Sequence, residues 1–155
     1  MGRRMGDIVP PAVRSRMMSG IKGKNSRPEM MVRRMLFASG YRFRLHRRDL
    51  PGTPDIVMSG RRIAIFVHGC FWHAHKGCKY FKAPATRSDF WTAKLQANVE
   101  RDKKAIEKLT TMGWRVLSIW ECVTRDHEAV KSLDKKIVQW INGDAQCGEI
   151  GGPPL

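Results

Sequence analysis

A dense group of histidines and cysteines lies near the middle of the chain. His68, Cys70, His73, His75 and Cys78 fall within eleven consecutive residues. Random placement of the chain's five histidines and four cysteines would put about 0.6 of them there. Imidazole nitrogens and thiolates are the ligands that zinc prefers in proteins. The group therefore predicts a metal-binding loop and not a piece of hydrophobic core.

Three of these residues have a spacing that suits a tetrahedral zinc site. Cys70, His75 and Cys78 supply three ligands. Cys122 is the best fourth, because it ends a strand that we expect beside the strand preceding the loop. Two alternatives stay open on spacing alone: His73 in place of His75 as a ligand, or a loop of reduced cysteines with no metal.

Carboxylates in unusual places indicate a second kind of chemistry. Asp55 opens a strand after a glycine turn, and Asp102 stands between Val99 and Ile106 in the apolar stripe of a helix. Glu29 lies in the first turn of another helix. Hydrolysis of a phosphodiester needs carboxylates to hold Mg²⁺ and an imidazole to take a proton from water.

Some of these residues also have an ordinary interpretation. An aspartate at the start of a strand, like Asp55, is more often a turn residue than a metal ligand. Glu29 fits a capping box with Ser26. Two other histidines, His46 and His127, have no chemically suited neighbours in the sequence, so we expect both to be solvated.

The charge of the chain favours a nucleic acid as its partner. The 155 residues include 29 Lys and Arg against 14 Asp and Glu, which gives a net charge of +15. Residues 1–48 carry +11 of this charge, because they hold 13 basic residues and two acids. Binding to ribosomal-type RNA or to a membrane surface also fits the charge, but a basic amphipathic helix with an aromatic face is missing.

The length and hydropathy predict one cytosolic domain. The longest apolar run, residues 63–67, is too short for a transmembrane helix, and the N-terminus lacks the apolar stretch of a secretory signal. In the cytosol the four cysteines would be reduced, which favours metal binding over disulfides.

Apolar periodicity predicts an α/β domain in which a meander of three strands precedes a helical crossover to a fourth. The expected helices begin at capping or polar residues and end at glycines: residues 26–40, 88–113, with Ser88 as the cap, and a last helix that ends at 143. The expected strands are short and apolar: residues 41–45, 55–58, 63–67 and 115–120. Three divisions follow: a flexible basic arm that would order on a partner (1–24), a folded α/β domain (25–143) and a loose tail with Cys147 (144–155).

Seven stretches carry a recognisable combination of motifs, of which the run His-Gly-Cys-Phe-Trp-His at residues 68–73 is the most specific. The stretches are residues 14–21, 50–55, 65–73, 84–91, 98–102, 113–116 and 120–122. Together they resemble the very-short-patch repair DNA mismatch endonucleases of bacteria.

The resemblance implies a restriction-endonuclease-like fold, a mixed sheet flanked by helices with a structural zinc site. It implies Mg²⁺-dependent nicking of one strand of duplex DNA at a T·G mismatch in a short recognition sequence. Deamination of 5-methylcytosine produces that mismatch. The implied enzyme is a monomer at the bacterial nucleoid in the cytoplasm, and it acts in company with a cytosine-5 DNA methyltransferase and a repair polymerase.

The resemblance also implies roles for individual residues. Asp55 would hold Mg²⁺ together with the backbone carbonyl of Val67, and His73 would be the general base. The supporting polar residues would be Glu29, His68 and Asp102. The zinc ligands would be Cys70, His75, Cys78 and Cys122, in agreement with the spacing.

Contacts with DNA are implied at two places. Phe71, Trp72 and Trp91 would wedge between base pairs beside the mismatch; the alternative is that Phe71 and Trp72 are buried against the zinc loop. The arm would reach the opposite groove with residues that the motifs place there: Met18, Ile21, Arg14 and Arg16.

The chain departs from the family's pattern in two ways, and from that of the wider nuclease superfamily in a third. Val67 stands where the family has a threonine, so only the Val67 carbonyl can help to hold a metal. Lys76 and Gly77 make the zinc loop one residue longer. Relative to the wider nuclease superfamily, Phe66, Val67 and His68 replace a second acid and a lysine. A histidine would then carry out the proton transfer.

Two other functions compete with mismatch nicking. One is a restriction or homing nuclease that cuts both strands of intact duplex. The other is a zinc-containing DNA-binding module with no enzymatic activity, for which Mg²⁺ would make no difference. The bases that flank the mismatch are not encoded in any single motif.

Overall fold

The structure of the protein is a computed structural model that describes residues 25–151. Four residues with expected DNA contacts, Arg14, Arg16, Met18 and Ile21, lie outside the described residues. Their contacts with DNA therefore stay predictions.

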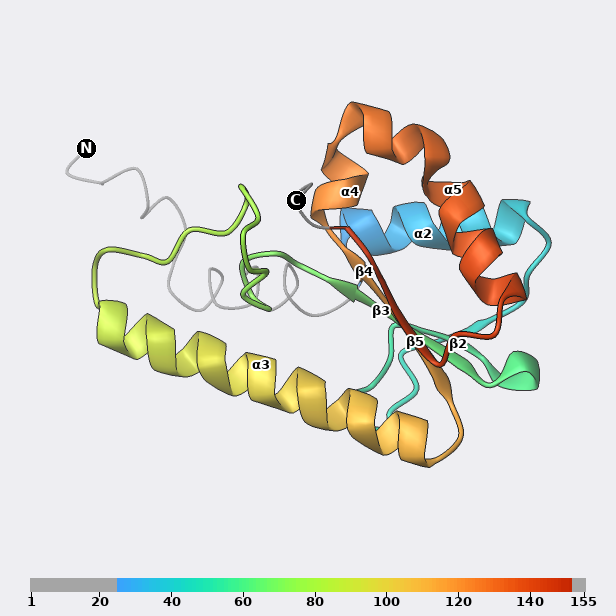
Figure 1. Ribbon diagram of the computed structural model, residues 1–155, viewed down its shortest axis with the longest axis horizontal. Helices are drawn as coiled ribbons and strands as arrows, with labels where there is room; N and C mark the ends of the chain where they lie inside the picture. Colours follow the sequence, from blue (N-terminus) through green and yellow to red (C-terminus); the bar gives the residue numbers. More distant parts are fainter. Residues whose placement is uncertain (1–24, 152–155) are drawn as a thin grey trace, which may run out of the picture.

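A mixed sheet of five strands forms the centre of the fold (Figure 1). The strands are β1 (Arg44–Leu45), β2 (Ile56–Met58), β3 (Ile63–His68), β4 (Arg115–Trp120) and β5 (Cys147–Ile150). Their order in the sheet is the order in the chain. β1, β2 and β3 form an antiparallel meander, whereas β4 runs parallel to both β3 and β5. The predicted α/β class is confirmed, as is the meander followed by a helical crossover.

Helices cover both faces of the sheet (Figure 1). They are α2 (Arg27–Ala38), α3 (Ser88–Thr111), α4 (Cys122–Arg125) and α5 (His127–Asn142). α3 makes the crossover from β3 to β4 and covers one face, and α2 and α5 pack on the other. A single-turn 3₁₀ helix, η2 (Ser59–Arg61), joins β2 to β3.

The apolar run of β3 results from burial on both of its faces. Ile63 and Ile65 belong to the core formed with α2 and α5, whereas Ala64 and Phe66 belong to the core formed with α3. Successive side chains of a strand point to opposite faces, so a strand between two helical layers needs apolar residues at every position.

The start of α2 only half confirms the expected capping box. Ser26 Oγ accepts a hydrogen bond from the Glu29 N–H at 3.3 Å, as a helix cap does. The Glu29 carboxylate accepts instead from the N–H of Asn25 at 3.2 Å. Glu29 is 2% exposed, and its second oxygen is directed to partners in the candidate active site.

The expectation of a loose C-terminal tail is wrong for residues 147–150. These residues form β5, whose Cys147 pairs with Val116 and whose Ile150 pairs with Ile119. Exposure alternates along β5, and Ile150 packs against the core. The strand was missed because its four residues include a glycine, a glutamate and only one aliphatic residue, which is too weak a pattern for periodicity to detect.

One expected helix cap is wrong, and one short helix was not predicted. Ser88 does not cap α3 but is its first residue, and the cap position belongs to Arg87, which has a left-handed φ of 56° and no capping side chain. The short helix α4 was not expected, because four residues are too few for a periodic pattern.

The turn before Asp55 packs tightly against α3. Gly52 has φ of +76°, and a Cβ there would lie 2.6 Å from the Cβ of Ala105 and 3.1 Å from the ring of Phe66. Only glycine fits this approach without displacement. The turn thus fixes the start of β2, and with it Asp55, relative to α3.

Candidate active site and metal cluster

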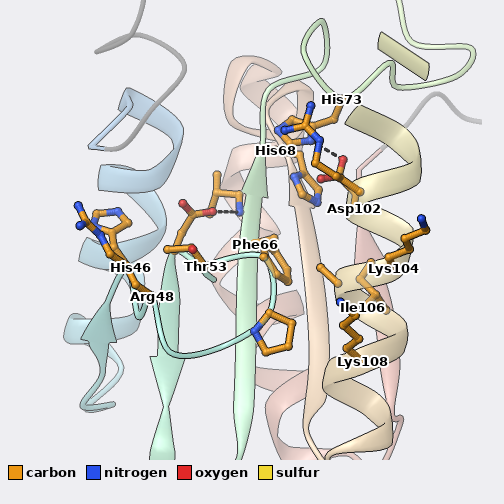
Figure 2. Close-up of a pocket in the computed structure, with 16 residues that line it drawn as sticks. His46, Arg48, Thr53, Phe66, His68, His73, Asp102, Lys104, Ile106 and Lys108 are labelled. Carbon is orange, nitrogen blue, oxygen red and sulfur yellow. Dashed lines mark hydrogen bonds and ion pairs between the residues drawn. The ribbon is translucent and has the colours of Figure 1, made fainter. Parts of the chain in front are cut away.

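An open cavity of about 870 Å³ lies beside the start of β2, the end of β3 and the middle of α3. β2 and β3 are antiparallel, so the residue before β2 and the last residues of β3 meet at the same edge of the sheet. Figure 2 shows His46 and Arg48 on one side of Phe66, and Asp102, Lys104 and Lys108 on the other.

Asp55 lines this cavity directly before β2. Its Oδ2 accepts a hydrogen bond from the Val67 N–H at 2.8 Å. Its Oδ1 has no hydrogen-bond partner among residues 25–151. Burial, with a smaller contribution from the nearby Glu29, raises the pKa of Asp55 from 3.8 to about 7, although the hydrogen bond from the Val67 N–H acts in the lowering direction. A cation bound at Asp55 would offset this cost of ionisation.

His73 and Asp102 form a hydrogen-bonded pair on the α3 side of the cavity. Nδ1 of His73 lies 2.5 Å from Oδ2 of Asp102, and both side chains are 28% exposed. An ionised carboxylate can only accept, so in the neutral form of the imidazole Nδ1 carries the proton and Nε2 the lone pair. The inward aspartate of the helix stripe is thus explained: it meets a histidine and not the aliphatic core.

His68 lies beneath this pair. It is 5% exposed, and its ring centroid is 4.1 Å from that of His73. Burial, with a smaller effect of the neighbouring His73, lowers the pKa of His68 from 6.5 to about 3. His68 is therefore a neutral imidazole near neutral pH, and it supports the position of the His73 ring.

Glu29 reaches the same cavity region from α2 and pairs with two residues that were not expected there. His46 Nε2 lies 2.7 Å from Glu29 Oε2, and the Arg33 guanidinium also donates to this oxygen. Donor atoms of Glu29, His46 and Asp55 all lie within 4.8 Å of one another. The position of Glu29 beside Asp55 agrees with a supporting role and not with helix capping alone.

The expectation that His46 is solvated is wrong. Its side chain is 17% exposed, and its backbone N–H donates to the Asp55 carbonyl at 3.1 Å. No sequence signal marks it, because the contact with Glu29 forms only when α2 packs beside the sheet. Arg33 was missed for the same reason. His127 is exposed, as expected.

A second cluster brings together the four residues that spacing selected as metal ligands. Donor atoms of Cys70, His75, Cys78 and Cys122 lie within 4.8 Å of one another. His75 Nδ1 is 3.5 Å from the Cys70 sulfur and 3.7 Å from the Cys122 sulfur. The structure thus places His75, and not His73, with the cysteines.

The environment of this cluster suits a cation. Burial raises the pKa of the Cys70 thiol, and the nearby Cys122 and Cys78 raise it further, because thiolates crowded together repel one another. A bound dication reverses this balance and holds the thiols in their ionised form. Three sulfurs and one imidazole nitrogen could therefore hold a metal ion.

Trp120 connects the metal cluster to the cavity. Its ring stacks on His75 with centroids 3.9 Å apart, and it lies 5.1 Å from the ring of His68. Its indole N–H donates to the Glu149 carboxylate of β5 at 2.7 Å. β5 thereby fixes the indole that separates the two sites.

An aromatic cluster borders the loop that carries His73. Phe71 lies 5.0 Å from Trp72 and 5.6 Å from Trp91, measured between ring centroids. All three are half-buried, and Asn98 of α3 donates to the Trp72 carbonyl at 2.9 Å. The rings pack on one another at the surface, so neither complete burial nor full exposure describes them.

Comparison with known proteins identifies the family. Residues 6–79 match the family model described as DNA mismatch endonuclease Vsr. DNA mismatch endonuclease Vsr of Escherichia coli is 40% identical over 148 residues, which is 94% of each chain. This chain belongs to the Vsr family of DNA mismatch endonucleases. The resemblance inferred from the motifs is confirmed.

Other relatives of the Vsr family carry the name of nicking enzymes. Type II nicking enzyme V.XorIIP of Xanthomonas oryzae is 46% identical over 134 residues, covering 86% of this chain and 98% of that protein. Type II nicking enzyme V.NmeAIP of Neisseria meningitidis is 36% identical over 137 residues, covering 88% and 97%. The chain is thus a DNA endonuclease, a hydrolase whose substrate is DNA.

The structure unites most of the Vsr residues expected from the sequence. The cavity is lined by the four expected side chains Asp55, His68, His73 and Asp102, and by Val67.

No helix within residues 25–151 is long and apolar enough to cross a membrane.

Proposed function

We propose that this Vsr family member nicks one strand of duplex DNA at a T·G mismatch within a short recognition sequence, as the first step of very-short-patch repair. The observation that carries the proposal is the single cavity that joins Asp55 to the His73–Asp102 pair beside an aromatic cluster. Hydrolysis needs the first two features, and selection of a weakened base pair needs the third.

Mg²⁺ fits the oxygen donors at Asp55. Residues 25–151 offer the Oδ1 of Asp55 no hydrogen bond, and burial makes the ionised carboxylate costly without a cation. The Val67 carbonyl would be a second ligand, because the valine side chain offers none. Bound there, Mg²⁺ supplies the positive charge against which negative charge develops on the scissile phosphate.

His73 takes the proton from the attacking water. Its Nε2 is the free acceptor, because Nδ1 donates to Asp102. Asp102 keeps the ring oriented and stabilises the imidazolium that forms. His68 supports the ring as a neutral partner, and Glu29 acts on the other side of Asp55 through Arg33 and His46.

The aromatic side chains that insert between base pairs are those of Phe71, Trp72 and Trp91. Opening a base step costs a few kcal/mol, and a mismatched pair is cheaper to open than a matched one. The half-buried rings on one surface could insert without first leaving a core. Insertion beside the reacting phosphate would couple mismatch detection to cleavage.

Zinc is the ion proposed for the metal cluster. Three thiols and one imidazole, of which only Cys122 is half-buried and the others buried, with no carboxylate among them, form the closed donor set of a structural zinc site. Its role would be to hold the loop that carries Phe71, Trp72 and His73 against the end of β4.

The wider setting follows from the substrate. A T·G mismatch arises where a cytosine-5 DNA methyltransferase has acted and deamination has followed, and a nick needs a polymerase to complete the repair. We therefore propose a monomeric enzyme at the bacterial nucleoid in the cytoplasm, with residues 1–24 as a basic DNA-binding arm.

Nicking assays on duplexes labelled on both strands test this function. With Mg²⁺, a duplex that contains T·G should be cut in one strand only, and its T·A parent should stay intact. Placing T·G in varied sequence contexts would reveal the recognition sequence. Cutting of both strands of the T·A parent would establish the restriction-type alternative instead.

A further inference from the structure

The active-site cavity contains cations that the proposed reaction does not use. Arg48 lines it from the loop between β1 and β2, and Arg101, Lys104 and Lys108 line it from α3. Arg48, Lys104 and Lys108 form no ion pair with any residue in the described range 25–151. Arg101 donates to the neutral amide of Asn98. The positive charges that face the cavity are thus left for a ligand.

The two lysines have a defined position relative to the catalytic groups. α3 runs from Trp91, in the aromatic cluster, past Asp102 at the cavity to Lys104 and Lys108. At a rise of 1.5 Å per residue, Lys108 lies about 9 Å beyond Asp102 along the helix axis. Along the axis of a duplex, one DNA strand advances about 3.4 Å per nucleotide. With that axis parallel to α3, the distance from Asp102 to Lys108 corresponds to two or three nucleotides.

The opposite wall carries the matching charge. Figure 2 shows Arg48 on one side of Phe66 and the two lysines on the other. A polyanionic strand between the two walls would meet positive charge on both sides. Cations on only one wall would instead fit a duplex lying across a flat surface.

We propose that Arg48, Lys104 and Lys108 form a phosphate track for the backbone of the nicked strand. The track holds the two or three phosphates that follow the scissile phosphate on the side away from the aromatic cluster. The inference rests on the proposed function. It adds that the strand is fixed on both sides of the nick, by aromatic insertion on one side and by phosphate contacts on the other.

The salt dependence of binding tests the charge contacts. The full chain with its zinc is titrated with a matched T·A duplex at several NaCl concentrations, without Mg²⁺. Lys104→Ala and Lys108→Ala should each lower the slope of log Kd against log salt by about 1, because each loses one phosphate contact. Lys103→Ala is the control, since Lys103 is exposed on α3 but does not line the cavity. An equal change for Lys103→Ala would overturn the track.

The position of the track is tested with neutral phosphates. Single methylphosphonates are placed along both strands of a T·G duplex, again without Mg²⁺. A methylphosphonate two or three nucleotides from the nick, on the side away from the mismatch, should weaken duplex binding by the wild-type protein about threefold to tenfold. The same methylphosphonate should change duplex binding by Lys108→Ala by no more than about twofold. Coupling to phosphates on the mismatch side, to the other strand, or to none would overturn the proposal.

These outcomes are separable from failure of the proposed function. The salt series uses a matched duplex and needs neither mismatch recognition nor hydrolysis. If wild type does not nick the T·G duplex, the proposed function fails, whatever the salt slopes are. If nicking occurs but the lysine variants behave like Lys103→Ala, only the track fails.

Discussion

The imidazole of His73 is hydrogen-bonded to the carboxylate of Asp102 at 2.5 Å, although the two residues are 29 positions apart in the chain. The bond joins the loop of the metal cluster to the helix that makes the sheet's crossover. The proposed metal site, the fold and the proposed proton transfer would therefore depend on one another. A change that releases the loop should remove the base from its position even if every catalytic side chain is still present.

Replacing the aspartate of this pair should slow the reaction and leave the metal cluster intact. In Asp102→Asn the amide can turn its NH₂ toward Nδ1 and favour the tautomer whose Nε2 is protonated and useless as a base. We expect the single-turnover nicking rate to fall by about tenfold or more, with one zinc still bound per chain. An unchanged rate would show that Asp102 does not position His73.

Removing one metal ligand should destabilise the whole domain. Cys122→Ser breaks the link between the loop and the end of β4, and structural zinc sites contribute folding free energy directly. Melting temperature, bound zinc and nicking should all fall. Cys147→Ser is the matched control, because Cys147 is exposed on β5 and lies outside the cluster. A Cys122→Ser protein with wild-type melting and one zinc per chain would contradict the assignment.

Replacing one of the inserting aromatic side chains by alanine should reduce discrimination between T·G and T·A duplexes more than it reduces affinity for duplex DNA in general. Trp72→Ala should weaken binding to a T·G duplex by about tenfold and to the T·A parent by much less, because only the mismatch is opened on binding. Fluorescence anisotropy with both duplexes at one salt concentration measures this. Equal losses on the two duplexes would mean that Trp72 only supports the loop.

The half-buried carboxylate of Asp55 should reduce stability at neutral pH when Mg²⁺ is absent. Its pKa is raised from 3.8 to about 7 in the fold, so the folded state keeps a proton that the unfolded chain has lost between these values. The stability that the protonated form provides is complete below pH 4 and is lost as the pH rises through 7. Asp55→Asn avoids that loss.

Urea unfolding from pH 5 to pH 8, in Mg²⁺-free buffer with zinc retained, tests this. The free energy of unfolding of Asp55→Asn should exceed that of wild type by an amount that grows with pH, to the order of a few kcal/mol. Asp134→Asn, an exposed change on α5, is the control and should leave the curve unchanged. Parallel pH curves for wild type and Asp55→Asn would exclude the burial effect.

Local patterns in the sequence predicted the parts of the site that lie within a short stretch of chain. The metal ligands Cys70, His75 and Cys78 are close in sequence, and their chemistry is distinctive. Asp102 was noticed because it interrupts an apolar stripe, which is a local conflict that a tertiary contact resolves. The meander of the first three strands and the helical crossover to β4 followed from the order of strand and helix patterns, whereas the fifth strand was not predicted.

Contacts made only by tertiary packing were not predictable in this way. His46 and Arg33 meet Glu29 because α2 docks beside β1 and β2, and neither residue stands out in its own segment. β5 was missed because its short sequence carries only a weak apolar pattern, whereas its place in the sheet depends on pairing with the distant strand β4. The cap of α3 was misplaced because Arg87 adopts a left-handed conformation that is usual for glycine.

The proposed mechanism assigns proton transfer to His73 and metal binding to His75. Single-turnover nicking of a T·G duplex by His73→Ala, with zinc content and duplex affinity measured on the same protein, tests it most directly. The rate should fall by about 10² or more, while zinc stays at one per chain and affinity stays within about tenfold of wild type. Loss of zinc from His73→Ala, together with its retention in His75→Ala, would contradict these assignments.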